Sequence, residues 1–346
     1  MAAKHLKAYS EETLAEYISY RKGEVKLGES LSCFSGLFSA DTLSRHSQDF
    51  VIVGLREDLG VQANLGNPGA SEGFEAFLSH FLNIQDNGFI RPSEVMILGE
   101  VDVEDLIEAR SKLDLNRAQD MRKLHGLTAT IDDRLSPVIE TIVRAGKIPI
   151  VIGGGHNNCY GILKGFYQAR KQPIHALNLD PHADFRALEG RHSGNGFSYA
   201  WEHGYLEDYY IIGLHEAYNN RTILESLRER SMGFTSFEEI EIRKEISLET
   251  AIEKGFSKLK KEPVGIELDT DSILSFPASA FTSTGFSSSD ARRYAYLCGT
   301  YEQSAYLHVC EAAPSLLPDG FKIAGKILTG IVMDFIKGKR TTLSRS

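Results

Sequence analysis

The sequence predicts an α/β protein in which a mainly parallel sheet of about eight strands lies between two layers of helices. Short apolar runs rich in β-branched residues alternate with longer segments of helical periodicity along the chain. This alternation is typical of βαβ units, whose strands are buried on both faces. Loops rich in Gly, Ser and Asn follow three of the runs, at Leu55, Leu179 and Leu268. In such sheets, ligands bind beyond the carboxyl ends of the strands.

Each predicted strand is a short apolar run bounded by polar or turn-forming residues, and the last of them is the weakest. The predicted strands are Phe50–Leu55, Val95–Leu98, Ile148–Ile152, Ile174–Leu179, Tyr209–Ile212, Val264–Leu268, Tyr306–Cys310 and Met232–Thr235. Helical periodicity fills the intervals between them. The predicted helices are Ser71–Leu82, Val103–Leu113, Ala118–Ala145, Tyr160–Ala169, Arg221–Arg230, Leu248–Lys260, Ser288–Glu302 and Gly320–Ile336.

Length and charge narrow the organisation and the partners. The 346 residues contain no convincing linker, so we expect one domain over residues 1–346, with a helical N-terminal extension over residues 1–45. The formal net charge of −9 disfavours nucleic acid and anionic membranes as partners. No run approaches 18 apolar residues, and no signal-peptide core is visible. These observations favour a cytoplasmic protein that acts on a small molecule.

The segment Asp180–Asp184 directly follows the apolar run Ile174–Leu179. Side chains two apart in extended chain point to the same face, so Asp180, His182 and Asp184 should converge at a strand end. Two buried carboxylates and an imidazole are costly unless a positive charge compensates them. A divalent metal ion is the natural compensator.

Two further motifs follow other predicted strands. Asp269 and Asp271 share a face after Val264–Leu268, and Gly153–Gly155 deliver His156 after Ile148–Ile152. Two imidazoles and four carboxylates exceed what one ion needs, and they suit two ions with shared bridging carboxylates. Mixed oxygen and nitrogen ligands favour Mn²⁺ over a thiol-loving metal.

Each motif alone has an ordinary structural interpretation. An isolated Asp-x-His or Asp-x-Asp is often only the polar end of a strand, and Gly-Gly-Gly-His can be a tight turn or a phosphate-cradling loop. The sequence lacks the P-loop and dinucleotide-binding patterns, which argues against a nucleotide. The occurrence of all three motifs after predicted strands favours the metal site.

At these residues the sequence resembles the arginase/agmatinase/formimidoylglutamase (ureohydrolase) family. The resemblance spans about residues 48–337 and rests on Gly153–His156, Asp180–Asp184 and Asp269–Asp271, in the family's chain order. It implies an arginase-like three-layer fold, two Mn²⁺ ions and a possible homo-oligomer. It also implies a metal ligand for each of six residues: His156 and Asp184 for one ion, His182 and Asp271 for the other, and Asp180 and Asp269 as bridges.

Within that family the chain is most similar to formimidoylglutamases. Gly155 replaces the aspartate of the commoner Gly-Gly-Asp-His form, and Arg186 stands where arginases have asparagine. Arg186 suits a substrate carboxylate, which it can hold with two parallel hydrogen bonds. Ser193 and Asn195 lie at the spacing of the family's substrate loop.

The resemblance also implies residues for the chemistry. Glu311 matches the acid that grips the amidine or guanidinium group, and Asp184 is expected to relay a proton from the attacking water to the leaving nitrogen. Phe197 occupies the position of the arginase proton-shuttling histidine, and His192 lies nearby as a possible substitute.

The favoured function is hydrolysis of N-formimidoyl-L-glutamate to L-glutamate and formamide. Two alternatives remain open: an arginase, agmatinase or other guanidino-acid hydrolase that releases urea, and a metal-bearing scaffold without turnover. Arg186 disfavours agmatine, which has no carboxylate. The absence of a histidine at Phe197 motivates the scaffold.

Overall fold

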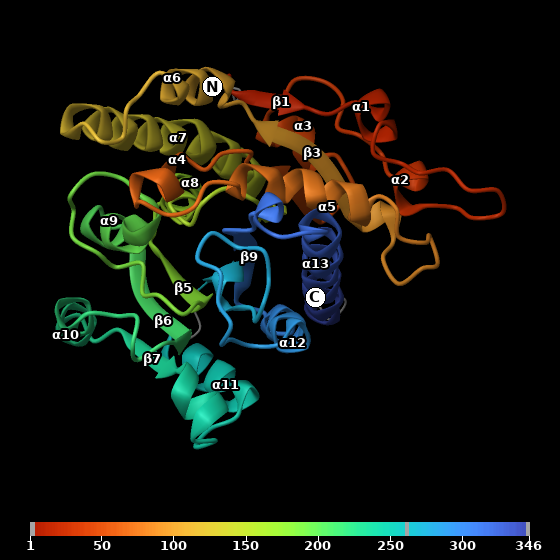
Figure 1. Cartoon of the computed structure of the whole chain (residues 1–346). Helices are drawn as coiled ribbons and strands as arrows, with labels where there is room; N and C mark the ends of the chain where they lie inside the picture. Colours follow the sequence, from red (N-terminus) through yellow and green to blue (C-terminus); the bar gives the residue numbers. More distant parts are fainter. Residues whose placement is uncertain (1–3, 260–262, 344–346) are drawn as a thin grey trace.

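The computed structural model of the chain describes residues 4–259 and 263–343, and a single mixed sheet passes through the described part (Figure 1). Its strand order is β1-β3-β2-β4-β9-β8-β5-β6-β7, and every neighbouring pair is parallel except β1 with β3. The strands are β1 Leu6–Ala8, β2 Phe50–Gly54, β3 Val95–Val101, β4 Ile148–Ile152, β5 Ile174–Leu179, β6 Leu206–Leu214, β7 Gly233–Ser236, β8 Val264–Asp269 and β9 Ser304–Cys310.

Helices cover both faces of this sheet, which confirms the predicted three-layer α/β class. Helices α5, α11, α12 and α13 contribute to the apolar cluster on one face, and α7, α8 and α9 to the cluster on the other. The helices are α1 Glu11–Ala15, α2 Leu27–Ser30, α3 Ala40–Ser44, α4 Leu59–Ala63, α5 Gly73–Phe81, α6 Glu104–Ser111, α7 Ala118–Arg144, α8 Asn158–Arg170, α9 Gly196–Glu202, α10 Arg221–Glu229, α11 Leu248–Lys258, α12 Ser288–Gly299 and α13 Gly320–Leu343.

Strand β2 shows why the predicted strands read as continuous apolar runs. Phe50 and Ile52 pack into the cluster with α5 and α13, whereas Val51 and Val53 pack into the cluster with α7 and α8. Burying each such side chain contributes roughly 1.5–3 kcal/mol. A strand covered on both faces therefore keeps apolar residues at every position, and all eight predicted strands are present.

The N-terminal segment differs from the expected helical extension in one respect. It contains the short helices α1, α2 and α3, but residues 6–8 form β1, which adds to the edge of the sheet antiparallel to β3. The three residues of β1 are half-buried or exposed. A strand of three residues is too short for periodicity to be detected, and its backbone pairing with β3 and the packing of Leu6 hold it in place.

Two short helices near the carboxyl edge were also not predicted. Helix α4 lies in the loop after β2, and α9 lies in the long segment between β5 and β6. Helix α4 has five residues and α9 has seven, so both are too short for a helical pattern to emerge.

The order of the strands brings the predicted motifs together at one end of the sheet. Strands β4, β9, β8 and β5 are consecutive neighbours and parallel, so their carboxyl ends meet at one edge. His156 follows β4, Glu311 follows β9, Asp269 ends β8 and Asp180 follows β5. Four segments distant in sequence therefore deliver polar side chains to one place.

Candidate active site

The imidazole of His156 lies among three carboxylates. Its Nδ1 is 3.1 Å from Asp180 Oδ2 and 2.9 Å from Asp184 Oδ2. The Oδ2 atom of Asp269 lies 3.2 Å from the same nitrogen. These four side chains form a group whose spacing fits a metal ion.

The second imidazole lies beside the same group. His182 Nδ1 is 3.6 Å from Asp180 Oδ1 and 3.9 Å from Asp271 Oδ2. Asp180 therefore faces both imidazoles, one with each carboxylate oxygen. The structure brings together all six side chains that the sequence nominated as metal ligands.

The loop backbone at this edge adopts conformations that aim side chains inward. Asp184 has φ 46° and Glu311 has φ 64°, in the left-handed region that side-chain-bearing residues seldom adopt. Such strain persists only where surrounding contacts impose it, and it clusters at functional sites. For Glu311 these contacts include the backbone N–H of His156, which donates to Oε1 at 2.6 Å.

The presence of glycine at position 155 has a steric explanation. A Cβ at this position would lie 2.5 Å from Asn157 Oδ1 and 2.7 Å from Val61 Cγ2. An aspartate there, as in the commoner form of the motif, would require the neighbouring side chains to move. The close approach of α4 to the loop after β4 thus accounts for the third glycine.

Electrostatics in this buried space favour a bound cation. Burial, and then the charge of Asp269, raise the pKa of Asp271 well above its usual range. Burial, followed by the charge of Asp271, raises the pKa of Glu311 to about 8. Burial also raises the pKa of Asp269, with the charge of Asp180 adding to the effect. Acids that resist ionisation are stabilised as carboxylates when divalent cations neutralise them, so the donor set fits a metal pair.

Glu57 organises the loop that carries His156, and sequence reasoning missed it. This fully buried carboxylate accepts hydrogen bonds from the backbone of Leu59 and Gly155 at 2.7 and 3.2 Å. It also accepts from Asn157 and Asn158 side chains at 3.2 and 2.6 Å. The available signal was an acid placed three residues beyond a buried strand, a weak indication in one sequence.

Phe197 closes the site behind His156. It is fully buried, and its ring meets the His156 ring edge-on at a centroid distance of 5.1 Å. Tyr209 stacks against the other side of Phe197 at 4.3 Å. The position that the arginase resemblance associates with proton transfer therefore holds an apolar packing residue.

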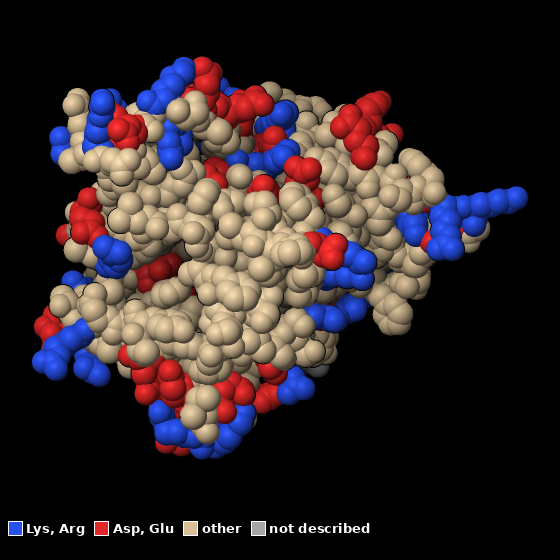
Figure 2. All heavy atoms as spheres, in the orientation of Figure 1, with Lys and Arg blue, Asp and Glu red and all other residues tan. Residues whose placement is uncertain are grey.

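A cavity of about 370 Å³ opens onto the carboxylates. Asp184 and Glu311 line it, and Arg186, Ser193 and Asn64 form one of its sides. Arg186 donates to Asn64 Oδ1 at 3.1 Å, and Asn64 Nδ2 donates to Ser193 Oγ at 3.2 Å. Figure 2 shows a hollow on one face of the molecule, with acidic atoms deep inside it and mainly uncharged side chains around its mouth.

Two expected site residues lie elsewhere. Asn195 does not line the cavity: it is fully buried, and its amide bonds Arg191 and the loop backbone at Ala187 and Gly190. His192 is also buried outside the lining, where its Nδ1 accepts from Gly194 N–H at 3.2 Å. In this structure both side chains form hydrogen bonds within their own loop, and the substrate contact of Asn195 and the proton-shuttling role of His192 stay predictions.

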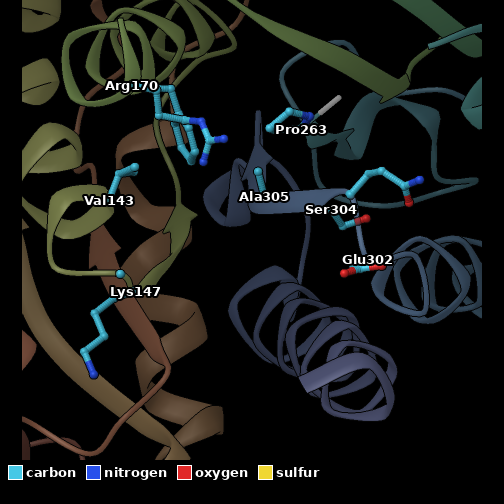
Figure 3. Close-up of a pocket in the computed structure, with 10 residues that line it drawn as sticks. Val143, Lys147, Arg170, Pro263, Glu302, Ser304 and Ala305 are labelled. Atoms are coloured by element: carbon cyan, nitrogen blue, oxygen red, sulfur yellow. The ribbon is translucent and has the colours of Figure 1, made fainter. Parts of the chain in front are cut away.

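A second cavity lies at the opposite edge of the sheet (Figure 3). It has a volume of about 560 Å³ and is lined by Lys147, Pro263 and Ser304, at the amino ends of β4, β8 and β9. Arg170 and Glu302 contribute opposite charges. Ligand sites in such sheets gather at carboxyl ends, and none of the predicted site residues lines this cavity.

Fold and site together define a class of protein: a parallel α/β protein with a candidate two-metal centre at the carboxyl edge of its sheet. The chain belongs to the arginase family, whose model matches residues 48–333. A formimidoylglutamase of Corynebacterium efficiens is 31% identical over 194 residues, which cover 55% of this chain but only 53% of that relative. A formimidoylglutamase of Macrococcus caseolyticus is 25% identical over 292 residues, covering 81% of this chain and 83% of the relative.

Solved structures share the fold. A formiminoglutamase of Trypanosoma cruzi with Mn²⁺ superposes with a TM-score of 0.70 at 20% identity, covering 90% of this chain and 98% of that one. A formimidoylglutamase of Bacillus subtilis gives a TM-score of 0.70 at 13% identity, covering 93% and 94% of the two chains. No helix within the described residues is long and apolar enough to cross a membrane.

Proposed function

We propose that this protein is a binuclear manganese hydrolase that cleaves the amidine C–N bond of N-formimidoyl-L-glutamate, giving L-glutamate and formamide. The single observation that carries the proposal is the convergence of two imidazoles and four carboxylates beside a cavity that also holds Arg186. Membership of the arginase family and the names of its relatives support the same reaction.

The metal ligands are assigned by proximity and by family resemblance. His156 and Asp184 would hold one Mn²⁺, and His182 and Asp271 would hold the other. Asp180 and Asp269 would be shared, which fits the position of Asp180 between the two imidazoles. When bound, such a pair lowers the pKa of a water molecule enough to supply hydroxide near neutral pH.

The chain's own residues then orient the substrate and move the proton. The new bond joins the water oxygen to the formimidoyl carbon, and the bond that breaks joins this carbon to the glutamate nitrogen. Glu311 lines the cavity, and its ionised carboxylate binds the amidine group of the substrate. Asp184 carries the water proton to the leaving nitrogen, so that this nitrogen departs as a neutral amine and not as an amide anion.

The polar side of the cavity would hold the glutamate moiety. Arg186 is half exposed and already fixed by Asn64 and by Glu189, whose carboxylate lies 2.9 Å away. A substrate carboxylate would replace or share the Glu189 contact and gain two parallel hydrogen bonds. Ser193, bonded to the same Asn64, supplies a hydroxyl beside it.

We further propose a cytoplasmic location, a step in histidine degradation and a homo-oligomeric assembly. The acidic composition supports a small-molecule substrate and disfavours nucleic acid or an anionic membrane as partner.

The test is an assay of the full-length protein loaded with Mn²⁺. Formimidoylglutamate should yield glutamate and formamide in equal amounts, while agmatine, which lacks a carboxylate, should yield no urea. Arg186→Met should raise KM for formimidoylglutamate by roughly 10-fold or more, since a charge-assisted hydrogen bond contributes about 1.5–3 kcal/mol, and leave metal content unchanged. If the protein hydrolyses arginine or another guanidino acid but not formimidoylglutamate, the proposed substrate is wrong and the protein is a urea-releasing hydrolase.

A further inference from the structure

A buried polar cluster lies between the neighbouring strands β8 and β9, close to His156. Its members are Glu267, Tyr306 and His308, which we call the Glu267 cluster, and each is fully buried. Glu267 stands opposite His308 in the parallel register of these strands. None of the three lines the active-site cavity.

The carboxylate of Glu267 collects hydrogen bonds. Tyr306 donates its hydroxyl to Oε1 at 2.6 Å, and His308 Nδ1 donates to Oε2 at 2.6 Å. A buried carboxylate is retained in a core only where donors or charges compensate its lost hydration. Two donors already meet this need, yet the carboxylate also faces a third.

That third group is His156. Its Nε2 is buried and makes no hydrogen bond within 3.5 Å that satisfies ordinary geometry, but Glu267 Oε2 lies 3.5 Å away. The opposite nitrogen, Nδ1, faces Asp180, Asp184 and Asp269. If Nδ1 offers its lone pair to a cation, the ring proton must reside on Nε2, on the side of Glu267.

We propose that Glu267 is a positioning residue for the metal centre. Its carboxylate receives the Nε2–H of His156 and holds the imidazole in the tautomer and orientation that present Nδ1 to the metal. Phe197, packed edge-on against the ring, restricts its rotation. Histidine ligands in proteins commonly donate their second N–H to a carboxylate in this way. The inference rests on the proposed metal centre and is independent of the proposed substrate.

The experiment compares Glu267→Gln with the matched control Tyr306→Phe in the full-length protein. Both variants disturb the same hydrogen-bonded group, but only the first replaces the charged carboxylate that faces His156 with a neutral amide. Manganese affinity is measured by titration calorimetry of the metal-free protein, and thermal unfolding is followed in parallel. We expect Glu267→Gln to lower the affinity for one ion by roughly 10–100-fold. Tyr306→Phe should change it by less than about three-fold while lowering Tm.

Two further measurements keep the inference open to refutation. Glu267→Asp retains the charge but withdraws the oxygens from His156, so it should also weaken manganese binding if Glu267→Gln does not fold. Excess Mn²⁺ should restore hydrolysis in Glu267→Gln.

Equal manganese affinities in Glu267→Gln and Tyr306→Phe would show that Glu267 only stabilises the core and does not position His156. A zinc ion bound in the native protein by His156, His308 and Cys310, whose ligand atoms also lie close together, would overturn the inference as well. Because binding is measured directly, a failure to cleave formimidoylglutamate would reject only the substrate.

Discussion

The two halves of the candidate metal centre are built differently. The imidazole of His156 is fully buried, and its Nδ1 has three carboxylate oxygens within 3.2 Å. The His182 half is more open: its imidazole is 33% exposed, and the nearest carboxylate contacts are 3.6 and 3.9 Å. The imidazole of His156 lies in the packed interior, whereas that of His182 borders the cavity.

Different supports produce this contrast. Glu57 fixes the loop of His156 through backbone and side-chain hydrogen bonds. His182 stacks instead on Tyr218 at a centroid distance of 6.0 Å, and Tyr218 stacks on His215 at 4.6 Å. Hydrogen bonds to a buried acid hold one ligand rigidly, whereas stacked rings from the loop after β6 leave the other adjustable. We expect the two ions to differ in affinity for this reason.

The largest effect should come from Asp180→Ala, because Asp180 faces both imidazoles. This change removes the ligand that we propose both ions share, and it should lower manganese affinity more than 100-fold, beyond the range typical of outer-shell partners. Metal analysis of the purified variant should find neither ion, and hydrolysis should fall to background. Retention of both ions would show that the halves are not joined through this carboxylate.

Asp271→Ala should separate the halves, since Asp271 contacts His182 and not His156. We expect about one Mn²⁺ per chain to remain, and hydrolysis to fall by at least the roughly 10-fold typical of a lost outer-shell partner. Calorimetry of the variant should show a single binding event of native affinity. Asp271→Asn is the matched control for volume. Loss of both ions from Asp271→Ala would mean that the buried half cannot fill alone.

Metal binding should strengthen as pH rises. The pKa values of Asp269 and Asp271 are raised, and that of Glu311 is about 8, so the metal-free protein holds protons there that a cation must displace. An acid with a raised folded-state pKa stabilises the metal-free fold at low pH and loses this contribution as pH rises. The increase in Tm on adding Mn²⁺ should therefore grow between pH 5.5 and 8.

The size of this dependence reports how many protons are exchanged. Each proton displaced contributes a factor of about ten in affinity per pH unit. Thermal melts with and without Mn²⁺ across the range give the slope, with Ca²⁺ or buffer alone as the comparison. A Tm increase that does not vary with pH would contradict the protonation of these acids in the metal-free state.

Tyr218→Leu should give the smallest effect and affect only one ion. Aromatic pairs contribute about 0.5–1.5 kcal/mol. Losing the ring that stacks on His182 should therefore weaken the binding of the ion at His182 by roughly 2–12-fold. Tyr218→Phe keeps the stack and should behave like the native protein in the same titration. An equal loss in both ions would argue against a separate support for His182.

The sequence located the six ligand candidates because their motifs directly follow, or end, strands whose carboxyl ends meet. The period of two does not persist through the loops, where Asp184 has φ 46° and Asp271 lies in a 3-10 turn. For Asn195 and His192, the spacing within a loop did not show in which direction each side chain points. In the structure, Arg191 and the backbone draw both side chains into the interior of the loop. The roles of Glu57 and Glu267 were not predicted, because the function of a buried acid depends on partners from other strands, and one sequence does not identify those partners.

The two outermost strands of the sheet are the shortest strands in the described part of the chain. Strand β1 has three residues and β7 has four. Strand β3, directly inside β1, has seven buried residues, and Tyr9 ties the segment after β1 to it through Glu100 at 2.6 Å. Short edge strands offer little template for pairing with another chain. The segment that the family model does not match thus pairs with the outer side of β3, and its removal would expose the backbone donors and acceptors along that side of a seven-residue strand.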